Sequence, residues 1–461
     1  MSSAGISFGG LASGLDTKAI ISALVAVEQR PITQLQAKKT SLTKQKSLFG
    51  DLKGLLDKLT TAAKALKSTT EFLAMKATSS DEDVLKASAS SSATPGSYTF
   101  TVERLATGQV NATTGSASAT AAVAAVGFEF TLDVGGNQVP ITTDDPPTLQ
   151  GIANQINAAG QAVRAQVIDT GNQANGGANR YQLVLSATEI GSAGGFSLSI
   201  DPGEDPTAIA FVNDLSAGVK SDAQDAKIVL NGGIEVYRSS NTVSDLFNGL
   251  TLDLKATSTT PVTVTVSTDA EETSKKVEAF VEAYNKVVDF MAEQNKVSEE
   301  GKASGPLFGD VTLRSIRSSL RNIVGGQVET TGNEAYQLFS QIGITSDRDG
   351  KLTFNKSKFE EALGTDENAV ANIFTDATNG ISTRLETQID LYTDSVDGLI
   401  KARSDGFDRQ VKNTTDRIDQ AERRLELYQK QLEVKYANLE SLLSKLQGQG
   451  SGLSSLNNLS R

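Results

Sequence analysis

Residues 407–446 read FDRQVKNTTDRIDQAERRLELYQKQLEVKYANLESLLSKL, and this segment sets the architecture of the whole chain. Six apolar residues recur in it at intervals of seven: Val411, Ile418, Leu425, Leu432, Leu439 and Leu446. Seven residues are close to two helical turns, so these side chains lie along one line of a helix. The segment contains neither proline nor glycine. It therefore predicts one long helix whose narrow apolar seam suits a partner helix rather than a globular core.

The same spacing returns near the N-terminus, which predicts a second long helix. Five apolar residues of this seam are spaced seven apart: Leu35, Leu42, Phe49, Leu56 and Ala63. Each of the last three is followed, three positions later, by a leucine: Leu52, Leu59 and Leu66. Residues at these intervals share one helix face. Two long helices thus bracket the rest of the chain, and we interpret their two seams, Ala63 aside, as a coiled-coil and assembly surface.

The first helix is predicted to begin at Asp16, whose carboxylate can accept hydrogen bonds from the free amides of the next turn. Pro31 has no N–H to donate, so it should end or kink this helix, and a second helix should run from Ile32 to Leu66. Val27 extends the apolar face of the first helix. The expected docking residues of that helix are Leu15, Asp16, Ile20, Ile21 and Leu24.

Between the helices the apolar pattern changes to alternation, which is typical of half-buried strands. Alternating segments and two glycine-containing turns predict strands or hairpins at 98–102, 128–141, 181–185, 196–200, 228–237, 250–254 and 262–266. A short helix is expected within 148–160, ended by Gly160. Residues 111–125 are rich in Ala, Ser and Thr and are expected to form a linker.

Helical spacing resumes after Asp269, with helices predicted around 277–288, 313–323 and 356–363. The predicted fold is α+β and multidomain: a terminal coiled-coil stalk and a helical bundle with inserted antiparallel β domains, in a nested topology. The expected parts are a leg (1–42 and 401–461), a helical domain (43–76 and 272–400), an inner β domain (77–113 and 222–271) and an outer variable β domain (114–221).

The residue inventory argues against an enzyme. The chain has no Cys, His or Trp, which excludes disulfides, most zinc sites and histidine-based triads. The run from Asp347 to Gly350 is similar to the start of a calcium loop, but Lys358 stands where a bidentate Glu is required. A tight turn before a strand at 351–354 explains this run better. We expect no catalytic, cofactor or metal site.

Charge is distributed unevenly. Residues 1–76 hold 11 basic and 5 acidic residues and residues 401–461 hold 11 and 8, whereas the whole chain has a net charge of −12. The middle is therefore strongly acidic, which argues against a nucleic-acid partner. The sequence shows neither a secretory signal nor an apolar run long enough for a transmembrane helix. A cytosolic protein, or export by a route that uses no cleavable signal, is expected.

Six segments, in order, resemble the family of bacterial flagellar filament cap proteins, also called flagellar hook-associated protein 2. They are GLASGLDTKAIISALVAVEQRPITQL (10–35), SSDEDVLKASASSSATPGSYTFTVERLA (79–106), SSNTVSDLFNGLTLDL (239–254), VEAFVEAYNKVV (277–288), GPLFGDVTLRSIRSSLRNIV (305–324) and GITSDRDGKLTFNKSKFEEAL (343–363). Residues 111–221 match least specifically, as expected for the variable outer domain of the family.

The resemblance implies a homo-oligomeric cap at the extracellular tip of the filament. Five subunits are expected, within a range of four to six, although neither charge nor spacing sets this number. Implied partners are flagellin, which would fold beneath the cap and insert, the hook–filament junction protein and an export chaperone. Secretion by the flagellar export apparatus and a role in motility are implied as well, without membrane insertion.

Two alternatives stay open at this point. Another axial flagellar protein, either a hook–filament junction protein or flagellin itself, is one. Those families usually carry an Asn-rich NIAN-type motif near the N-terminus, which this chain lacks. A surface protein for cell adhesion, which binds host mucin through its β domains, is the other. A mucin-binding assay with residues 77–271 would test the second alternative.

Overall fold

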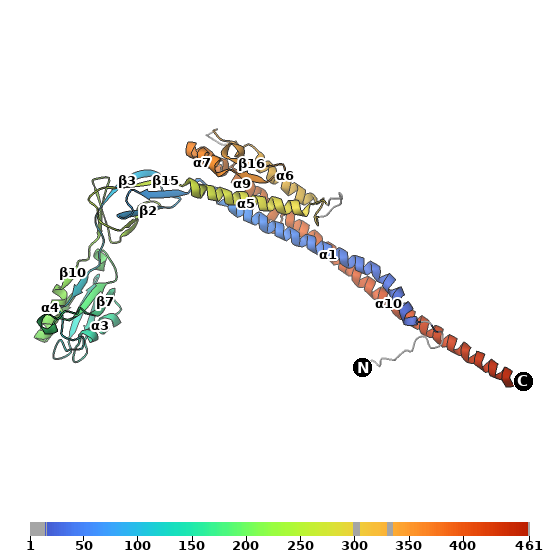
Figure 1. The fold of residues 1–461 in the computed structure, drawn as a ribbon, viewed down its shortest axis with the longest axis horizontal. Helices are drawn as coiled ribbons and strands as arrows, with labels where there is room; N and C mark the ends of the chain where they lie inside the picture. The colour runs from blue at the N-terminus through green and yellow to red at the C-terminus, as the bar shows by residue number, and fades with distance from the viewer. Residues whose placement is uncertain (1–13, 15, 298–304, 330–334, 460–461) are drawn as a thin grey trace. The chain divides into compact units, whose positions relative to one another are not determined.

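The computed structural model describes residues 14, 16–297, 305–329 and 335–459. The chain forms two compact units (Figure 1). The helical unit combines both ends of the chain, Met1–Phe72 and Thr273–Arg461, and the β unit comprises Leu73–Glu272. The predicted α+β class and nested order are thereby confirmed. The four-part division predicted from the sequence is finer than these two units and stays a prediction.

Two long helices dominate the helical unit, α1 (Thr17–Lys64) and α10 (Leu399–Leu459). They run antiparallel, because Lys46 of α1 pairs with Asp408 of α10 and the ring of Phe49 packs 5.8 Å from that of Phe407. Helix α10 is longer than predicted and continues past the start of α1 (Figure 1).

Pro31 was predicted to end or kink the first helix; the predicted end is wrong, and a kink stays a prediction. Helix α1 is continuous over 48 residues and contains Pro31. A proline in a helix removes one hydrogen bond and costs about 3 kcal/mol. The adjacent Ile32 is only 4% exposed, and the buried residues that follow it along α1, such as Leu42 and Phe49, offset that cost. The start was predicted correctly, since the Asp16 carboxylate accepts a hydrogen bond from the Ala19 amide at 2.9 Å.

Shorter elements complete the helical unit. They are α2 (Thr69–Phe72), α5 (Ala270–Gln294), α6 (Val311–Gly325), α7 (Lys356–Thr365), α8 (Glu367–Thr375), α9 (Ile381–Thr393) and the hairpin of β16 (Ile344–Ser346) and β17 (Leu352–Phe354). Aromatic rings form their core, with Phe72 stacked on Phe374 at 5.0 Å. The predicted turn precedes β17, and the Asp347 carboxylate accepts hydrogen bonds from the amides of Asp349 and Lys351.

The β unit has an inner core between two antiparallel sheets. One sheet has the order β1 (Met75–Ser79), β15 (Val262–Thr268), β3 (Gly96–Arg104), β11 (Ala226–Leu230) and β12 (Ile234–Arg238). The other has the order β13 (Thr242–Phe247), β14 (Leu250–Leu254) and β2 (Leu85–Ala89). Phe100, Ile228 and Leu252 are among the residues buried between them. The predicted hairpin of β11 and β12 is confirmed, and its turn residues Asn231 and Gly232 have positive φ.

A second core in the β unit joins two further antiparallel sheets to two helices. The sheets are β10 (Val219–Ser221), β4 (Val110–Ala112), β8 (Tyr181–Ala187) and β7 (Val163–Asp169), and β6 (Asn137–Thr142), β5 (Glu129–Val134) and β9 (Phe196–Ile200). The helices are α3 (Leu149–Ala158), which was predicted, and α4 (Pro206–Ala217), which was not. Asp205 caps α4, and Pro206 occupies its first turn, a placement proline favours.

The prediction of a linker at 111–125 is wrong. Ala124 is 6% exposed and belongs to the second core, Val123 packs against that core, and Ser116 forms a β-bridge with Tyr181. Alanine is apolar as well as small, so it can be buried in a core as readily as it occurs in a loop. Composition alone does not distinguish such a packed segment from a flexible one.

Candidate assembly surface of the terminal helices

The predicted seam of α1 is buried most deeply where the helical bundle covers it. Leu42 is 7% exposed and Leu35 is half-buried. The remaining predicted seam residues are fully buried: Phe49, Leu52, Leu56, Leu59 and Leu66. The structure therefore brings these residues together, whereas their proposed role in assembly stays a prediction.

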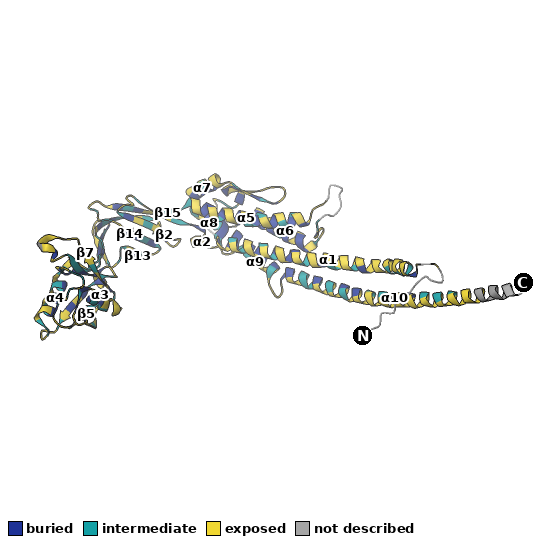
Figure 2. Ribbon diagram, turned by 60° about the horizontal axis from the view of Figure 1, so that its bottom comes forward, coloured by how far each residue is buried: buried dark blue, intermediate teal, exposed yellow. Residues whose placement is uncertain are grey.

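Burial along the predicted seam of α10 decreases toward the C-terminus (Figure 2). Ile418 is 6% and Leu432 8% exposed, and Val411 and Leu425 are half-buried. Leu439 is 39% and Leu446 54% exposed, as is Leu442 between them at 59%. These leucines are exposed because they lie beyond the start of α1. Lys46 of α1 is level with Asp408 of α10, so Thr17, the first residue of α1, is level with about residue 437 of the antiparallel α10.

The predicted docking residues of the N-terminal helix are only partly assembled. Leu15 lies outside the described residues. Asp16 caps the helix, Ile20 and Ile21 are half-buried, and Leu24 is 36% exposed. Exposed Leu24 thus adds to the apolar surface at this end of the paired helices.

A contact that the sequence did not predict connects α10 to α6. The Arg403 guanidinium donates a 2.7 Å hydrogen bond to the Asp310 carboxylate, which also accepts the amides of the first turn of α6. The same guanidinium lies 4.7 Å from the ring centre of Phe407, which packs on Phe49. The sequence does indicate that Asp310 caps a helix that begins at Val311. It does not indicate that Arg403, 93 residues away, is the partner of Asp310.

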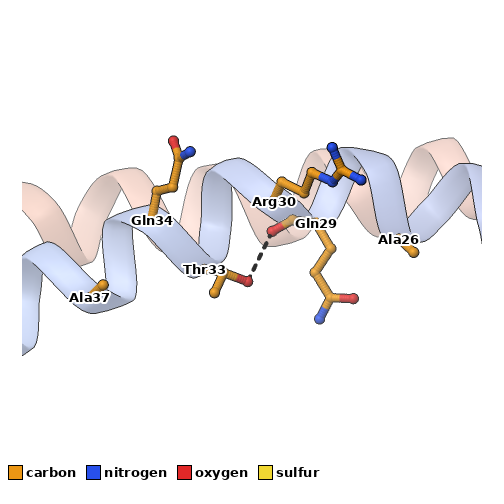
Figure 3. Close-up of a pocket in the computed structure, with 6 residues that line it drawn as sticks. All are labelled: Ala26, Gln29, Arg30, Thr33, Gln34 and Ala37. Carbon is orange, nitrogen blue, oxygen red and sulfur yellow. Dashed lines mark hydrogen bonds between the residues drawn. The ribbon is translucent and has the colours of Figure 1, made fainter.

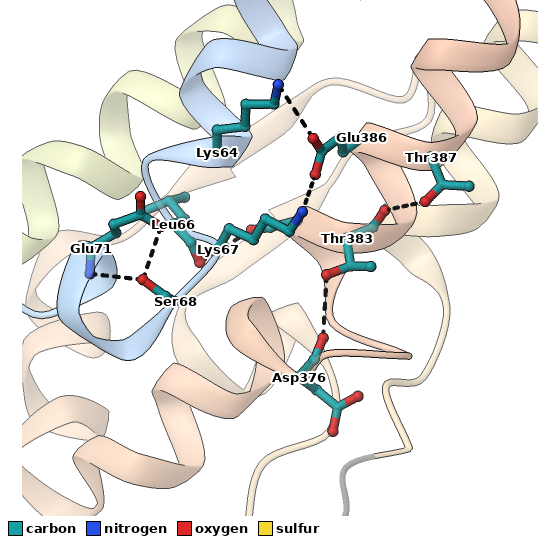
Figure 4. Close-up of polar contacts among 10 residues, drawn as sticks. Lys64, Leu66, Lys67, Ser68, Glu71, Asp376, Thr383, Glu386 and Thr387 are labelled. Carbon is teal, nitrogen blue, oxygen red and sulfur yellow. Dashed lines mark hydrogen bonds and ion pairs between the residues drawn. The ribbon is translucent and has the colours of Figure 1, made fainter.

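A second polar contact holds α9 against the end of α1 (Figure 4). The Glu386 carboxylate is paired with Lys67 and, at 3.3 Å, with Lys64. The hydrogen bond from Lys67 and the charge of both lysines hold the pKa of Glu386 below its usual value. Ser382 donates a hydrogen bond to the carbonyl oxygen of Leu66. The buried seam of α1 therefore ends at a set of polar contacts.

The outer face of α1 carries a shallow groove (Figure 3). Its volume is about 420 Å³, and it is lined by Ala26, Gln29, Arg30, Thr33, Gln34 and Ala37. All six residues are exposed, on the side of α1 turned away from Ile32 and the seam. Small side chains form the floor, so another helix could approach closely here.

Two kinds of feature are absent from the described residues. No group of three or more acidic side chains there is arranged to hold a metal ion. None of the helices described combines the length and apolar character needed to cross a membrane. What the described part of the helical unit offers is apolar and charged surface.

Comparison with known proteins supports the resemblance seen in the sequence. Family profiles described as flagellar hook-associated protein 2 N-terminus and C-terminus match residues 13–109 and 223–448. The B-type flagellar hook-associated protein 2 of Pseudomonas aeruginosa is 31% identical, with 93% of this chain and 92% of that protein covered. The flagellar hook-associated protein 2 of Escherichia coli K12 is 29% identical, with 98% and 97% covered.

A solved structure agrees with this result. The crystal structure of the D1-D2-D3 domains of the flagellar cap protein FliD from Escherichia coli matches with a TM-score of 0.59 and 31% identity. It covers 78% of this chain and 99% of that chain. The order of helical and β segments, the two matching profiles and the relatives along nearly the whole chain show that this protein belongs to the flagellar hook-associated protein 2 family of flagellar cap proteins.

Proposed function

We propose that this protein is a structural, non-enzymatic cap at the distal tip of the bacterial flagellar filament, secreted and extracellular. Subunits form a ring, and exported flagellin folds and inserts beneath it instead of being lost. The observation that carries the proposal is the similarity to cap proteins over 93% of the chain, combined with an α10 seam that remains exposed at Leu439 and Leu446.

The parts of the chain receive distinct roles in this proposal. Residues 1–42 and 401–461 form the leg that grips the filament end, and residues 43–76 with 272–400 form the helical domain above it. The inner β domain (77–113 and 222–271) and the outer β domain (114–221) form the plate. A ring of five subunits, within a range of four to six, is proposed, with flagellin, the hook–filament junction protein and an export chaperone as partners.

The exposed seam of α10 is the proposed gripping surface. Three leucines that stay 39–59% exposed among the described residues form apolar surface that a second chain can cover. Covering the part of each side chain that is still exposed contributes roughly 0.6–1.8 kcal/mol before the cost of ordering, as a fraction of the value for full burial. Three such residues give a modest interface, which suits a leg that must release and bind again as the filament grows.

Complementation of a deletion strain tests the proposal. The strain lacking this protein should have few filaments and should release unpolymerised flagellin, and the wild-type gene should restore filaments. A variant with Leu439→Asp and Leu446→Asp should be secreted but should not restore them. Leu391→Asp, at a 63% exposed leucine of α9, is the matched control and should behave as wild type.

Electron microscopy of cells and immunoblots of the medium give the result. Normal filaments in the deletion strain would overturn the capping proposal. Normal filaments with only the double variant would show instead that the exposed seam is not the gripping surface.

A further inference from the structure

Helix α1 has a basic face, formed by Arg30, Lys38 and Lys44, that no ion pair within the described residues neutralises. Between Glu28 and Asp51 it carries five cationic residues and no acidic one: Arg30, Lys38, Lys39, Lys44 and Lys46. Arg30, Lys38 and Lys44 are exposed, and none of them forms an ion pair within the described ranges. Arg30 also lines the groove on the outer face, where it projects beside Gln34 (Figure 3).

Helix α10 has a face with regularly spaced acidic residues, beside which Arg423 and Lys430 also lie. Asp419, Glu426, Glu433 and Glu440 follow one another at intervals of seven, and Glu422 lies one turn from the first two. Asp419 and Glu422 are exposed and have no ion-pair partner in the part of the chain that the structure describes. Glu426 is paired within the helix, with Lys430 at 2.8 Å.

The two faces lie at the same height along the paired helices. The ion pair of Lys46 with Asp408 sets the antiparallel register. Each step toward the N-terminus of α1 is therefore one step toward the C-terminus of α10. In this register Arg30 is level with about residue 424 and Lys38 with about residue 416. Asp419 and Glu422 thus fall between the heights of the two cations.

The two faces also point to different sides. A residue advances about 100° around a helix, so the basic face is turned about 140° from the seam of α1 and the acidic face about 90° from the seam of α10. Because the helices are antiparallel, these rotations place the basic face and the acidic face on opposite sides of the plane that contains both helix axes. Neither face can neutralise the other within one subunit.

We propose that the occupant of the basic face is the acidic face of a second copy of this protein. A ring needs two different, complementary surfaces on each subunit, at one height along the axis, so that each copy contacts the next head to tail. The paired helices offer such surfaces, and the small side chains of Ala26, Thr33 and Ala37 leave room for a neighbouring helix beside the cations. The inference rests on the proposed ring and names a contact within it.

Reversing the charges tests the contact in the full-length protein. One variant carries R30E, K38E and K44E, another carries D419K, E422K and E433K, and a third combines all six. Each triple variant should weaken self-association about tenfold or more at low salt, because like charges then face each other. The sixfold variant should recover wild-type association, since its charges are complementary again.

A charge-matched control separates this contact from a general effect of net charge. The variant K86E, R164E and K220E changes the same number of cations, at exposed positions of the β unit. It should associate like the wild type. Circular dichroism should show unchanged helix content in every variant.

Light scattering after gel filtration gives the oligomeric mass over a range of concentrations. Triple variants that associate like the wild type, or a sixfold variant that stays monomeric with full helix content, would overturn the inference. A wild-type protein that is monomeric at every concentration would instead contradict the proposed ring itself.

Discussion

At the scale of single residues, a few side chains fix α10 to the rest of the helical unit. Arg403 reaches Asp310, whose side chain is only 5% exposed, and lies over the ring of Phe407, which is buried against Phe49. The Arg403 Nε atom is buried and has no hydrogen-bond partner among the described residues. Removing Arg403, whose own side chain is 39% exposed, should cost about 1–3 kcal/mol, because the buried Asp310 carboxylate then lacks its charged partner.

Tyr284 of α5 makes the stability of the helical unit sensitive to high pH. Burial raises the pKa of this phenol from 10.0 to about 12. As the pH rises, this tyrosine ionises first in the unfolded chain. The free energy of unfolding is therefore unaffected by Tyr284 below about pH 10 and decreases as the pH rises toward 12. The Tyr284→Phe variant keeps the buried ring but cannot ionise. The free energy of unfolding, measured by urea titration, should decrease between pH 9 and about 11.5 by roughly 1–2 kcal/mol less in this variant than in the wild type. Equal losses would contradict this.

At the scale of elements, α1 shows that packing overrides local preference. The helix contains Pro31 and two exposed glycines, Gly50 and Gly54, each of which disfavours a helix. Its stability must therefore come from the seam, where Leu52 and Leu56 are fully buried. The same seam explains why the helix does not end where the proline stands.

The Pro31→Ala variant should stabilise the helical unit. Alanine restores a backbone N–H and removes the clash of the proline ring, an effect of roughly 1–3 kcal/mol. Urea unfolding monitored by circular dichroism should show a higher midpoint. Pro31→Gly is the control and should gain less, because glycine is a poor helix former. A lower midpoint for the alanine variant would show that packing on α10 depends on a proline-induced bend.

The Leu432→Asp variant tests the seam of α10. Leu432 is 8% exposed, and burying a carboxylate there should cost at least about 2–5 kcal/mol. We expect the paired helices to separate, the β unit to stay folded and capping to be lost. Leu427→Asp, at a 60% exposed leucine of the same helix, should leave filaments normal. Normal filaments with Leu432→Asp, scored by electron microscopy, would contradict the assigned role of the seam.

At the scale of the whole molecule, the two units have separate cores. The β unit buries its apolar residues in two clusters of its own, which include Leu183 and Leu252, whereas the helical unit is centred on rings such as Phe374 and Phe72. A chain of this kind is not expected to unfold in one all-or-none step. Each unit can respond separately to a substitution.

Calorimetry should therefore resolve at least two unfolding transitions. Phe407→Ala, which removes a 2% exposed ring from the helical unit, should lower the Tm of one of them by an amount that corresponds to about 3–5 kcal/mol. The matched substitution Phe130→Ala, at a 2% exposed ring of the β unit, should lower the Tm of another. A single transition that both variants shift equally would contradict independent units.

The sequence by itself determined the features that depend on residues close together in the chain. The heptad seams predicted both long helices, Asp16 marked the start of α1, and Asn231-Gly232 marked a hairpin, because helical spacing, caps and turns act over about seven residues or fewer. The ordered segments also indicated the family, which the comparisons then confirmed.

Only the tertiary structure decided which of these features are covered. It kept α1 continuous through Pro31, placed the Ala- and Ser-rich residues 111–125 partly in a core, and brought Arg403 to Asp310. It also left Leu446 exposed, although its heptad position equals that of buried Leu432. The reason is physical: burial depends on which distant segment lies opposite, and α1 ends before it reaches the last turns of α10.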